Sequence, residues 1–147
     1  MRILLASNEE DNKVLHAMSR ELSVEEILSD KVQNLAAEMK SYVMSDKKCK
    51  GLAAPQVGHN IRLFVIKHGK SSRTYINPTF LWRSRVTNSI EKCLSCGDIS
   101  KVRERFAKMN VEYVDETGKL HVIVLKDFNA FAYQHELDHL NGKLIID

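Results

Sequence analysis

Residues 127–142 read DFNAFAYQHELDHLNG, and this segment carries the strongest structural signal in the sequence. It predicts a helix that begins near Asp127 and ends near Asn141, because Gly142 then supplies the left-handed residue that often terminates a helix. Two histidines within the segment stand four positions apart, so their imidazoles lie on one face of that helix. We therefore interpret the other segments as the surroundings of this helix.

The His-Glu-x-x-His pattern of His135, Glu136 and His139 indicates metal-dependent hydrolysis. Two imidazoles at this spacing can bind one ion without distorting the helix. Glu136 stands beside the ion, where a carboxylate can take a proton from metal-bound water. An amphipathic helix with partly exposed histidines is the alternative, but three apolar neighbours favour a partly dry site: Phe128, Phe131 and Ala132.

A third ligand is needed, because catalytic metal sites usually offer three protein ligands and leave one position for water. Cys93 is our candidate, since a thiolate accepts iron as well as zinc. Four other histidines are isolated and fit surface or hydrogen-bonded positions better: His16, His59, His68 and His121. Cys93 also forms a C-x-x-C pair with Cys96, a pattern found in zinc ribbons and redox pairs. No second C-x-x-C exists, and we expect Cys96 to be a passive thiol.

Hydrophobic periodicity elsewhere predicts an α+β fold, with antiparallel sheets packed around the histidine-bearing helix. We expect helices over Glu9–Leu22 and Asp30–Ser45, the second capped by Asp30, and a short continuation that begins with a Ser23–Glu26 capping box. Strands are expected at four apolar runs, of which the middle two would form a hairpin about a DETG turn: Ile61–Ile66, Val111–Val114, Leu120–Leu125 and Leu144–Ile146.

The bulk composition fits one soluble domain that spans residues 1–147. The sequence is 44% hydrophobic and 28% charged, which is ordinary for a single core. Its net charge of +3 is spread along the chain, without the basic stripe of nucleic-acid-binding proteins. No segment approaches the ~20 apolar residues of a membrane helix, and the first residues do not resemble a secretory signal. Three cysteines, an odd number, argue for reduced thiols and a cytoplasmic protein.

Three segments, in this order along the chain, resemble the peptide deformylases: Gly51–Gly58 (GLAAPQVG), Glu91–Ser95 (EKCLS) and Gln134–His139 (QHELDH). The resemblance implies a metal-dependent hydrolase that removes the N-formyl group from the starting methionine of nascent polypeptides and releases formate. Its partners would be N-formylmethionyl peptides, with no nucleic acid and no membrane. We expect a monomer.

The same resemblance implies a role for each matching residue. One divalent ion, Fe(II) in the cell and replaceable by zinc, nickel or cobalt, would be held by Cys93, His135 and His139. Glu136 would serve as general acid and base while metal-bound hydroxide attacks the formyl carbon. The side-chain amide of Gln56 and the backbone N–H of Leu94 would then stabilise the developing oxyanion.

Selectivity for formyl-methionine requires an apolar pocket whose narrow entrance excludes larger acyl groups. We expect Leu94, Phe128, Phe131 and Ala132 to line this pocket, although the aromatic residues also fit a plain core. Gly51 would let a strand-like peptide approach the backbone closely, although it also fits an ordinary turn.

Two residues depart from the pattern of the family. Lys92 stands where the family has a glycine beside the metal ligand, and Cys49 replaces the first glycine of the opening segment. We expect the ammonium group of Lys92 to bias peptide binding towards acidic residues. The chain also ends five residues beyond Gly142, without the C-terminal extension of many bacterial members, so it resembles the short phage-encoded ones.

Two other functions stay open from the sequence. A His-Glu-x-x-His metalloprotease would need a third ligand downstream, where only Asp147 follows His139 as a candidate. A catalytically silent relative that captures formylated peptides would tolerate Lys92 and Cys49. Such a binder would have no need of Glu136 as a base.

Overall fold

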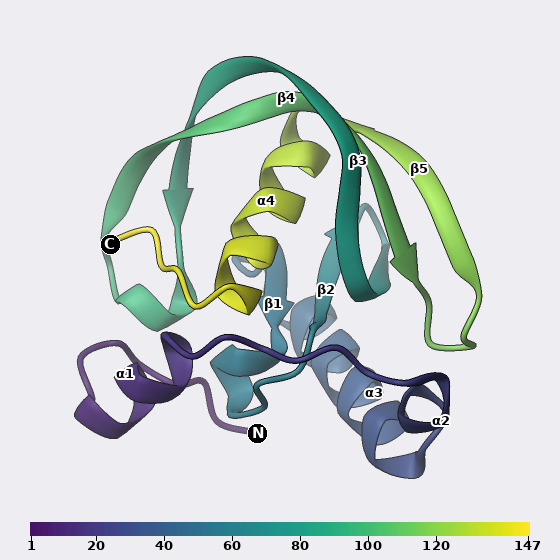
Figure 1. Cartoon of the computed structure of the whole chain (residues 1–147). Coiled ribbons are helices and arrows are strands. Elements are labelled where there is room, and N and C mark those ends of the chain that lie inside the picture. The colour runs from purple at the N-terminus through teal and green to yellow at the C-terminus, as the bar shows by residue number, and fades with distance from the viewer.

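Helix α4 (Phe128–Leu140) lies at the centre of the computed structural model, which describes all 147 residues (Figure 1). It follows Asp127 and ends at Asn141, whose N–H bonds to carbonyl groups of the last turn. Gly142 comes next with a φ of 73°, the left-handed conformation that favours glycine. The predicted bounds of this helix are therefore confirmed.

Five antiparallel strands form one continuous sheet in the order β1-β2-β3-β4-β5. Their bounds are Gly51–Ala53 (β1), Leu63–His68 (β2), Ser71–Lys92 (β3), Ser100–Val114 (β4) and Leu120–Lys126 (β5). The long strands β3 and β4 arch together over α4 (Figure 1), and a register shift between Ile76 and Thr79 helps β3 to bend. The predicted hairpin is β4 and β5, in which Val114 pairs with Leu120. The predicted α+β fold is confirmed.

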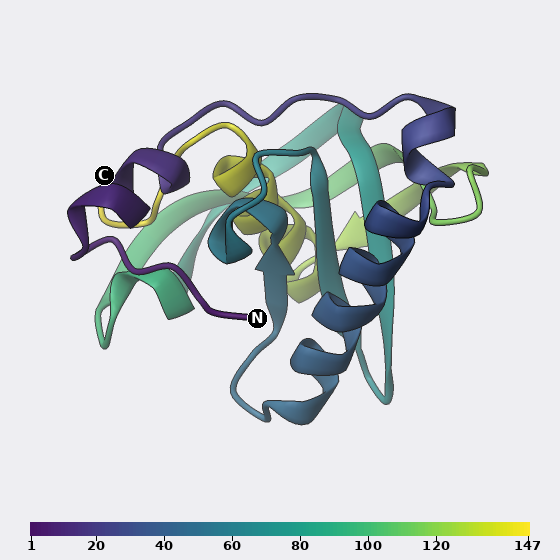
Figure 2. The same cartoon turned by 90° about the horizontal axis from the view of Figure 1, so that it is seen from below.

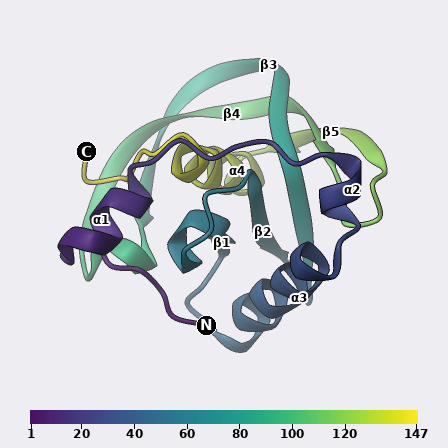
Figure 3. The same cartoon turned by 60° about the horizontal axis from the view of Figure 1, so that its bottom comes forward.

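Strand β2 separates two hydrophobic cores, which explains why its sequence LFVI is apolar without a break. Leu63 and Val65 belong to the core under α3 (Asp30–Ser45), whereas Phe64 and Ile66 belong to the core under α4. A strand that is covered on both faces carries apolar residues at successive positions. Figure 3 shows β2 between the two helices, and the predicted stripe of α3 is buried there: Val32, Leu35, Ala36, Met39 and Val43.

The N-terminal helix is shorter than predicted. Helix α1 spans Glu9–Leu15 rather than Glu9–Leu22, and the chain then runs extended across the molecule to α2 (Val24–Ile27) (Figure 2). Within this run the N–H of Ser19 donates to the carbonyl oxygen of Leu140, 2.9 Å away. Such long-range hydrogen bonds override a weak local preference for helix.

Two local predictions are wrong in detail, and one is confirmed. Ser29, not Asp30, caps α3, because the Oγ of Ser29 accepts the N–H of Val32 in the first turn of the helix. Residues Leu144–Ile146 form a turn rather than a strand. The Asp147 carboxylate accepts the N–H of Leu144 at 2.7 Å and stabilises this turn. The Ser23–Glu26 capping box is present and begins α2. The helices all fall short of what a transmembrane segment needs in length and hydrophobicity.

Candidate metal centre and substrate cavity

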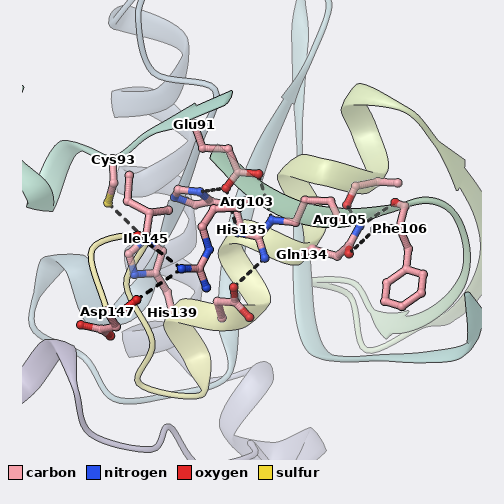
Figure 4. Close-up of polar contacts among 12 residues, drawn as sticks. Glu91, Cys93, Arg103, Arg105, Phe106, Gln134, His135, His139, Ile145 and Asp147 are labelled. Atoms are coloured by element: carbon pink, nitrogen blue, oxygen red, sulfur yellow. Dashed lines mark hydrogen bonds and ion pairs between the residues drawn. The ribbon is translucent and has the colours of Figure 1, made fainter. Parts of the chain in front are cut away.

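Three potential metal ligands from distant parts of the chain converge beside α4. Cys93 directly follows β3, whereas His135 and His139 project from successive turns of α4 (Figure 4). Their ligand atoms all lie within 4.8 Å of one another, and the Sγ of Cys93 is 3.4 Å from Nε2 of His139. One sulfur and two ring nitrogens at these separations are a suitable donor set for a single divalent ion.

Glu91 orients the ring of His135. Nδ1 of His135 donates to Oε1 of Glu91 at 2.9 Å, which leaves Nε2 as the ring nitrogen for a metal. Arg105 holds the same carboxylate with two bonds of 2.7 and 2.9 Å (Figure 4). It also donates to Asp138 at 2.7 Å. Burial by itself raises the pKa of Glu91, but the bonds from Arg105 and His135 outweigh it and lower that pKa to about 2. The carboxylate therefore stays ionised and fixes the tautomer of His135.

Glu136 lies between the ligand cluster and β1. Its side chain is buried, and burial is the main reason that its pKa rises to about 7. A carboxyl group with this pKa can hold or release a proton near neutral pH. A Cβ added to Gly51 would lie 2.8 Å from Oε1 of Glu136. The absence of a side chain at Gly51 thus makes room for the carboxylate.

The protein atoms around the ligand cluster fit a bound cation. Burial, followed by the charges of His135 and Arg105, lowers the pKa of His139 well below its usual value, so the ring is neutral. Neutral imidazole is the form that binds metals. Oε2 of Glu136 is buried without a hydrogen-bond partner in the protein. Orphaned polar atoms are rare in protein interiors, and this one, beside a Cys-His-His cluster, favours a bound species there.

The side chain of Gln56 is fixed next to the cysteine. Gln56 lies in the short helix η1 (Ala54–Val57), where its Oε1 accepts the N–H of Ala53 at 2.9 Å. Its Nε2 donates to Oγ of Ser95 at 3.2 Å and lies 3.6 Å from Sγ of Cys93. Gln56 is 2% exposed, so packing and hydrogen bonds together restrict its amide to one orientation.

A cavity of about 680 Å³ opens beside these residues, a size typical of small-ligand sites. Gln56, Cys93, His135 and Glu136 line it, and so do all five residues predicted to bind substrate: Gly51, Leu94, Phe128, Phe131 and Ala132. Phe128 is 52% exposed, which rules out the alternative that it is plain core. The cavity lining therefore combines the polar groups of the ligand cluster with apolar side chains.

The sequence did not reveal the partners of the histidines. Glu91 appeared only as part of the EKCLS segment, and nothing in the sequence joined it to Arg105 or Asp138. In the pairing of β3 with β4, Glu91 lies opposite Lys101 and Arg105 lies opposite Thr87, so the long side chain of Arg105 reaches along the strands to Glu91. Helix α4 supplies Asp138. The one general rule that could have indicated a partner for Glu91 is that a buried charged residue needs a partner of opposite charge.

The histidines and the cysteine that the sequence analysis rejected as metal ligands lie outside the ligand cluster. His16, His68 and His121 contact Asp147, Tyr75 and Asp115 respectively, and none of the three belongs to the ligand cluster. Cys96 is buried with a free thiol and packs in a small apolar cluster that includes Cys93, Leu4 and Leu144.

Comparisons with known proteins agree with this geometry. A family model described as Polypeptide deformylase matches residues 4–147. A peptide deformylase of Helicobacter hepaticus is 34% identical over 145 residues, which is 92% of this chain and 80% of the relative. The solved peptide deformylase of Thermotoga maritima has a TM-score of 0.89 and 31% identity, with 99% of this chain and 95% of that chain covered. A class I type b peptide deformylase of Acinetobacter baumannii, solved with Met-Ala-Ser bound, has a TM-score of 0.86 and 27% identity, with coverage of 99% and 96%.

Proposed function

This chain belongs to the polypeptide deformylase family, and from that premise we propose that it removes the N-formyl group from the starting methionine of nascent polypeptides. The convergence of Cys93, His135 and His139 beside the buried Glu136 carries the proposal. The reaction cleaves a linear amide bond by hydrolysis and releases formate.

The metal would be held by Cys93, His135 and His139, with Glu91 fixing the ring of His135. Fe(II) is the ion we propose in the cell, and zinc, nickel or cobalt suit the same one-sulfur, two-nitrogen donor set. When bound, a divalent ion polarises a carbonyl oxygen and lowers the pKa of coordinated water towards neutrality.

Glu136 would move the proton in this reaction. Its carboxylate accepts a proton from the attacking water and returns it to the methionine nitrogen as the C–N bond of the formamide breaks. Both transfers require a group that holds and releases a proton in one turnover, as general acid–base residues do. The absence of a side chain at Gly51 leaves room for this carboxylate in the cavity lining.

Gln56 and Leu94 would bind the formyl oxygen. The amide of Gln56 already donates to Ser95 beside the cysteine, so it is fixed before substrate arrives. A fixed donor next to the developing negative charge stabilises the transition state without reorganisation. The backbone N–H of Leu94, the residue that follows Cys93, would be the second donor.

The substrate would enter with its methionine side chain against Phe128, Phe131, Ala132 and Leu94. All four line the cavity, and a structural neighbour carries a bound Met-Ala-Ser peptide. We propose that the protein acts as a monomer in the cytoplasm on nascent chains, without binding nucleic acid or membranes directly.

Formate release tests the proposed function. Metal-loaded protein should release formate from formyl-Met-Ala-Ser and leave acetyl-Met-Ala-Ser intact. A Glu136→Ala variant should keep its metal content while kcat falls by ~10²- to 10⁴-fold, the usual contribution of a general base. Failure of the metal-loaded protein to release formate would refute the proposal.

The two rival functions predict different products. A metalloprotease would cut internal peptide bonds, which mass spectrometry of a longer peptide would detect. Asp147, its only candidate ligand downstream of the histidines, instead pairs with His16 at 2.9 Å. A silent binder would retain formylated peptide and release no more formate than the Glu136→Ala variant.

A further inference from the structure

The charged residues that line the cavity divide into two groups. Glu91 and Glu136 are buried within it, whereas Lys48, Lys50 and Lys92 are exposed and line the same cavity. The exposed charges thus lie on the part of the cavity lining that faces solvent. Three of these charges are positive, and the exposed carboxylate of Asp98 is the one negative charge among them.

The carboxylates near these lysines do little to neutralise them. Glu91 is already bound to Arg105 and His135 by three hydrogen bonds. Asp98, the remaining acidic residue of the lining, lies 3.8 Å from the Lys92 ammonium and is fully exposed. An ion pair of that kind is weak because water screens both charges. Lys48 and Lys50 form no ion pair at all.

All three lysines are close in sequence to residues of the reaction site. Lys50 precedes Gly51, where an added Cβ would lie 2.8 Å from Oε1 of Glu136. Lys48 stands two residues earlier in the same segment, and Lys92 directly precedes Cys93. Two of the stretches of chain that line the cavity, 48–51 and 89–94, therefore each carry lysine beside a site residue.

The position of strand β1 indicates how a bound peptide would run past these lysines. It is an edge strand, paired only with β2, and Gly51 is its first residue. A peptide that enters extended along such an edge presents alternate side chains to the residues beside it. Residues that follow the substrate's methionine would leave the cavity past the lysine-bearing segments.

We infer that the lysines at 48, 50 and 92 select formyl-methionyl peptides with acidic residues directly after the methionine. The inference rests on the proposed function, and it names the substrate class that the same site prefers. Opposite charges across a solvent-exposed rim attract over several ångströms, and like charges there repel. Peptides with lysine after the methionine are thus disfavoured.

The expected effect is moderate and depends on salt. An exposed charge pair changes an equilibrium by roughly 1.5- to 5-fold, so three lysines acting together should give a preference of about tenfold. The Debye length falls from about 30 Å at 0.01 M to about 3 Å at 1 M ionic strength. The preference should therefore largely disappear at high salt.

Matched glutamate and glutamine peptides provide the test. We would measure kcat/KM for formyl-Met-Glu-Glu, formyl-Met-Gln-Gln and formyl-Met-Lys-Lys with the metal-loaded protein, and Kd for the three unformylated peptides. The wild type should prefer the glutamate peptide in both measurements. Replacement of all three lysines, as Lys48→Gln, Lys50→Gln and Lys92→Gln together, should bring the Glu/Gln ratio close to one. Lys31→Gln, a lysine of α3 outside the cavity lining, should leave the ratio unchanged.

Two outcomes would overturn the inference. A Glu/Gln ratio near one in the wild type at low salt would do so, as would a preference that survives in the triple variant. Failure to deformylate the neutral glutamine peptide is a different result, because it refutes the proposed function. In that case the Kd ratio of the unformylated peptides still decides whether the lysines select acidic residues.

Discussion

A Glu91→Ala substitution removes the carboxylate that connects His135 to Arg105, and we expect it to weaken both the fold and metal binding. The side chains of Glu91 and Arg105 are only 8% and 6% exposed. Loss of one partner leaves a buried guanidinium with Asp138 alone and His135 without a partner for Nδ1. Breaking a buried ion pair in this way typically costs about 3–5 kcal/mol. In a chain of this length that corresponds to a fall in Tm of roughly 10 °C.

Metal affinity should fall as well, because Nδ1 of His135 no longer has the acceptor that orients its ring. Removal of such an outer partner typically costs about 10- to 100-fold in metal affinity. Glu91→Gln should be milder, since its amide oxygen can still accept from His135. Thermal unfolding and competition with a chelator would measure the two effects separately.

Glu104→Ala is the matched control for this substitution. Glu104 is an exposed residue on β4, next to Arg105, and forms no ion pair. We expect its ΔΔG to stay within about 0.5 kcal/mol, as is usual at the surface. If Glu91→Ala behaved like Glu104→Ala in both assays, the buried carboxylate would have neither role that we assign to it.

Three further results are expected. Gly51→Ala should lower kcat by roughly 10- to 100-fold without unfolding the protein, because the added Cβ would displace the carboxylate of Glu136. An unchanged kcat would contradict the close approach of Gly51 to Glu136. Bonds from the Arg2 side chain and then the Leu5 N–H lower the pKa of Asp11 to about 2, so its contribution to stability is present above its unfolded pKa of about 4 and is lost as pH falls towards 2. Urea unfolding of Asp11→Asn should therefore show a shallower loss than the wild type in that window, and parallel curves would refute this. Chelation of the metal should abolish formate release while far-UV circular dichroism persists, because neither of the two large cores includes a metal ligand. Unfolding on chelation would show that the metal holds the fold.

The parts of the structure that the sequence predicted are those set by local spacing. His135 and His139 share a helical face whatever surrounds them, and Gly142 ends the helix by its own backbone conformation. The apolar run of β2 required burial on both faces and allowed few other interpretations. Local rules therefore sufficed for α4, α3 and the turn between β4 and β5. They placed β2 only to within two residues, since it spans Leu63–His68 rather than Ile61–Ile66, and they found only the end of β4, which begins at Ser100 rather than Val111.

The parts that the sequence missed depend on contacts between distant segments. Most of β3 is exposed and mixes polar with apolar residues, so its strand conformation comes from pairing with β4 along the arch. The run after α1 is held by Leu140, far along the chain. Residues 144–146 are apolar because Leu144 and Ile145 pack beside Cys93, not because they form a strand. Arg105 likewise contacts Glu91 although the strand register places it opposite Thr87, and no local pattern in the sequence indicates that contact.

The most direct test of the account is the cobalt-substituted protein, in which thiolate ligation produces a charge-transfer absorption band. We predict one ion per chain, the thiolate band in the wild type, and loss of that band in Cys93→Ser with the fold retained. His135→Ala and His139→Ala should each weaken metal binding. A thiolate band that survives in Cys93→Ser, or full metal occupancy without either histidine, would contradict the proposal that these three residues hold one catalytic ion.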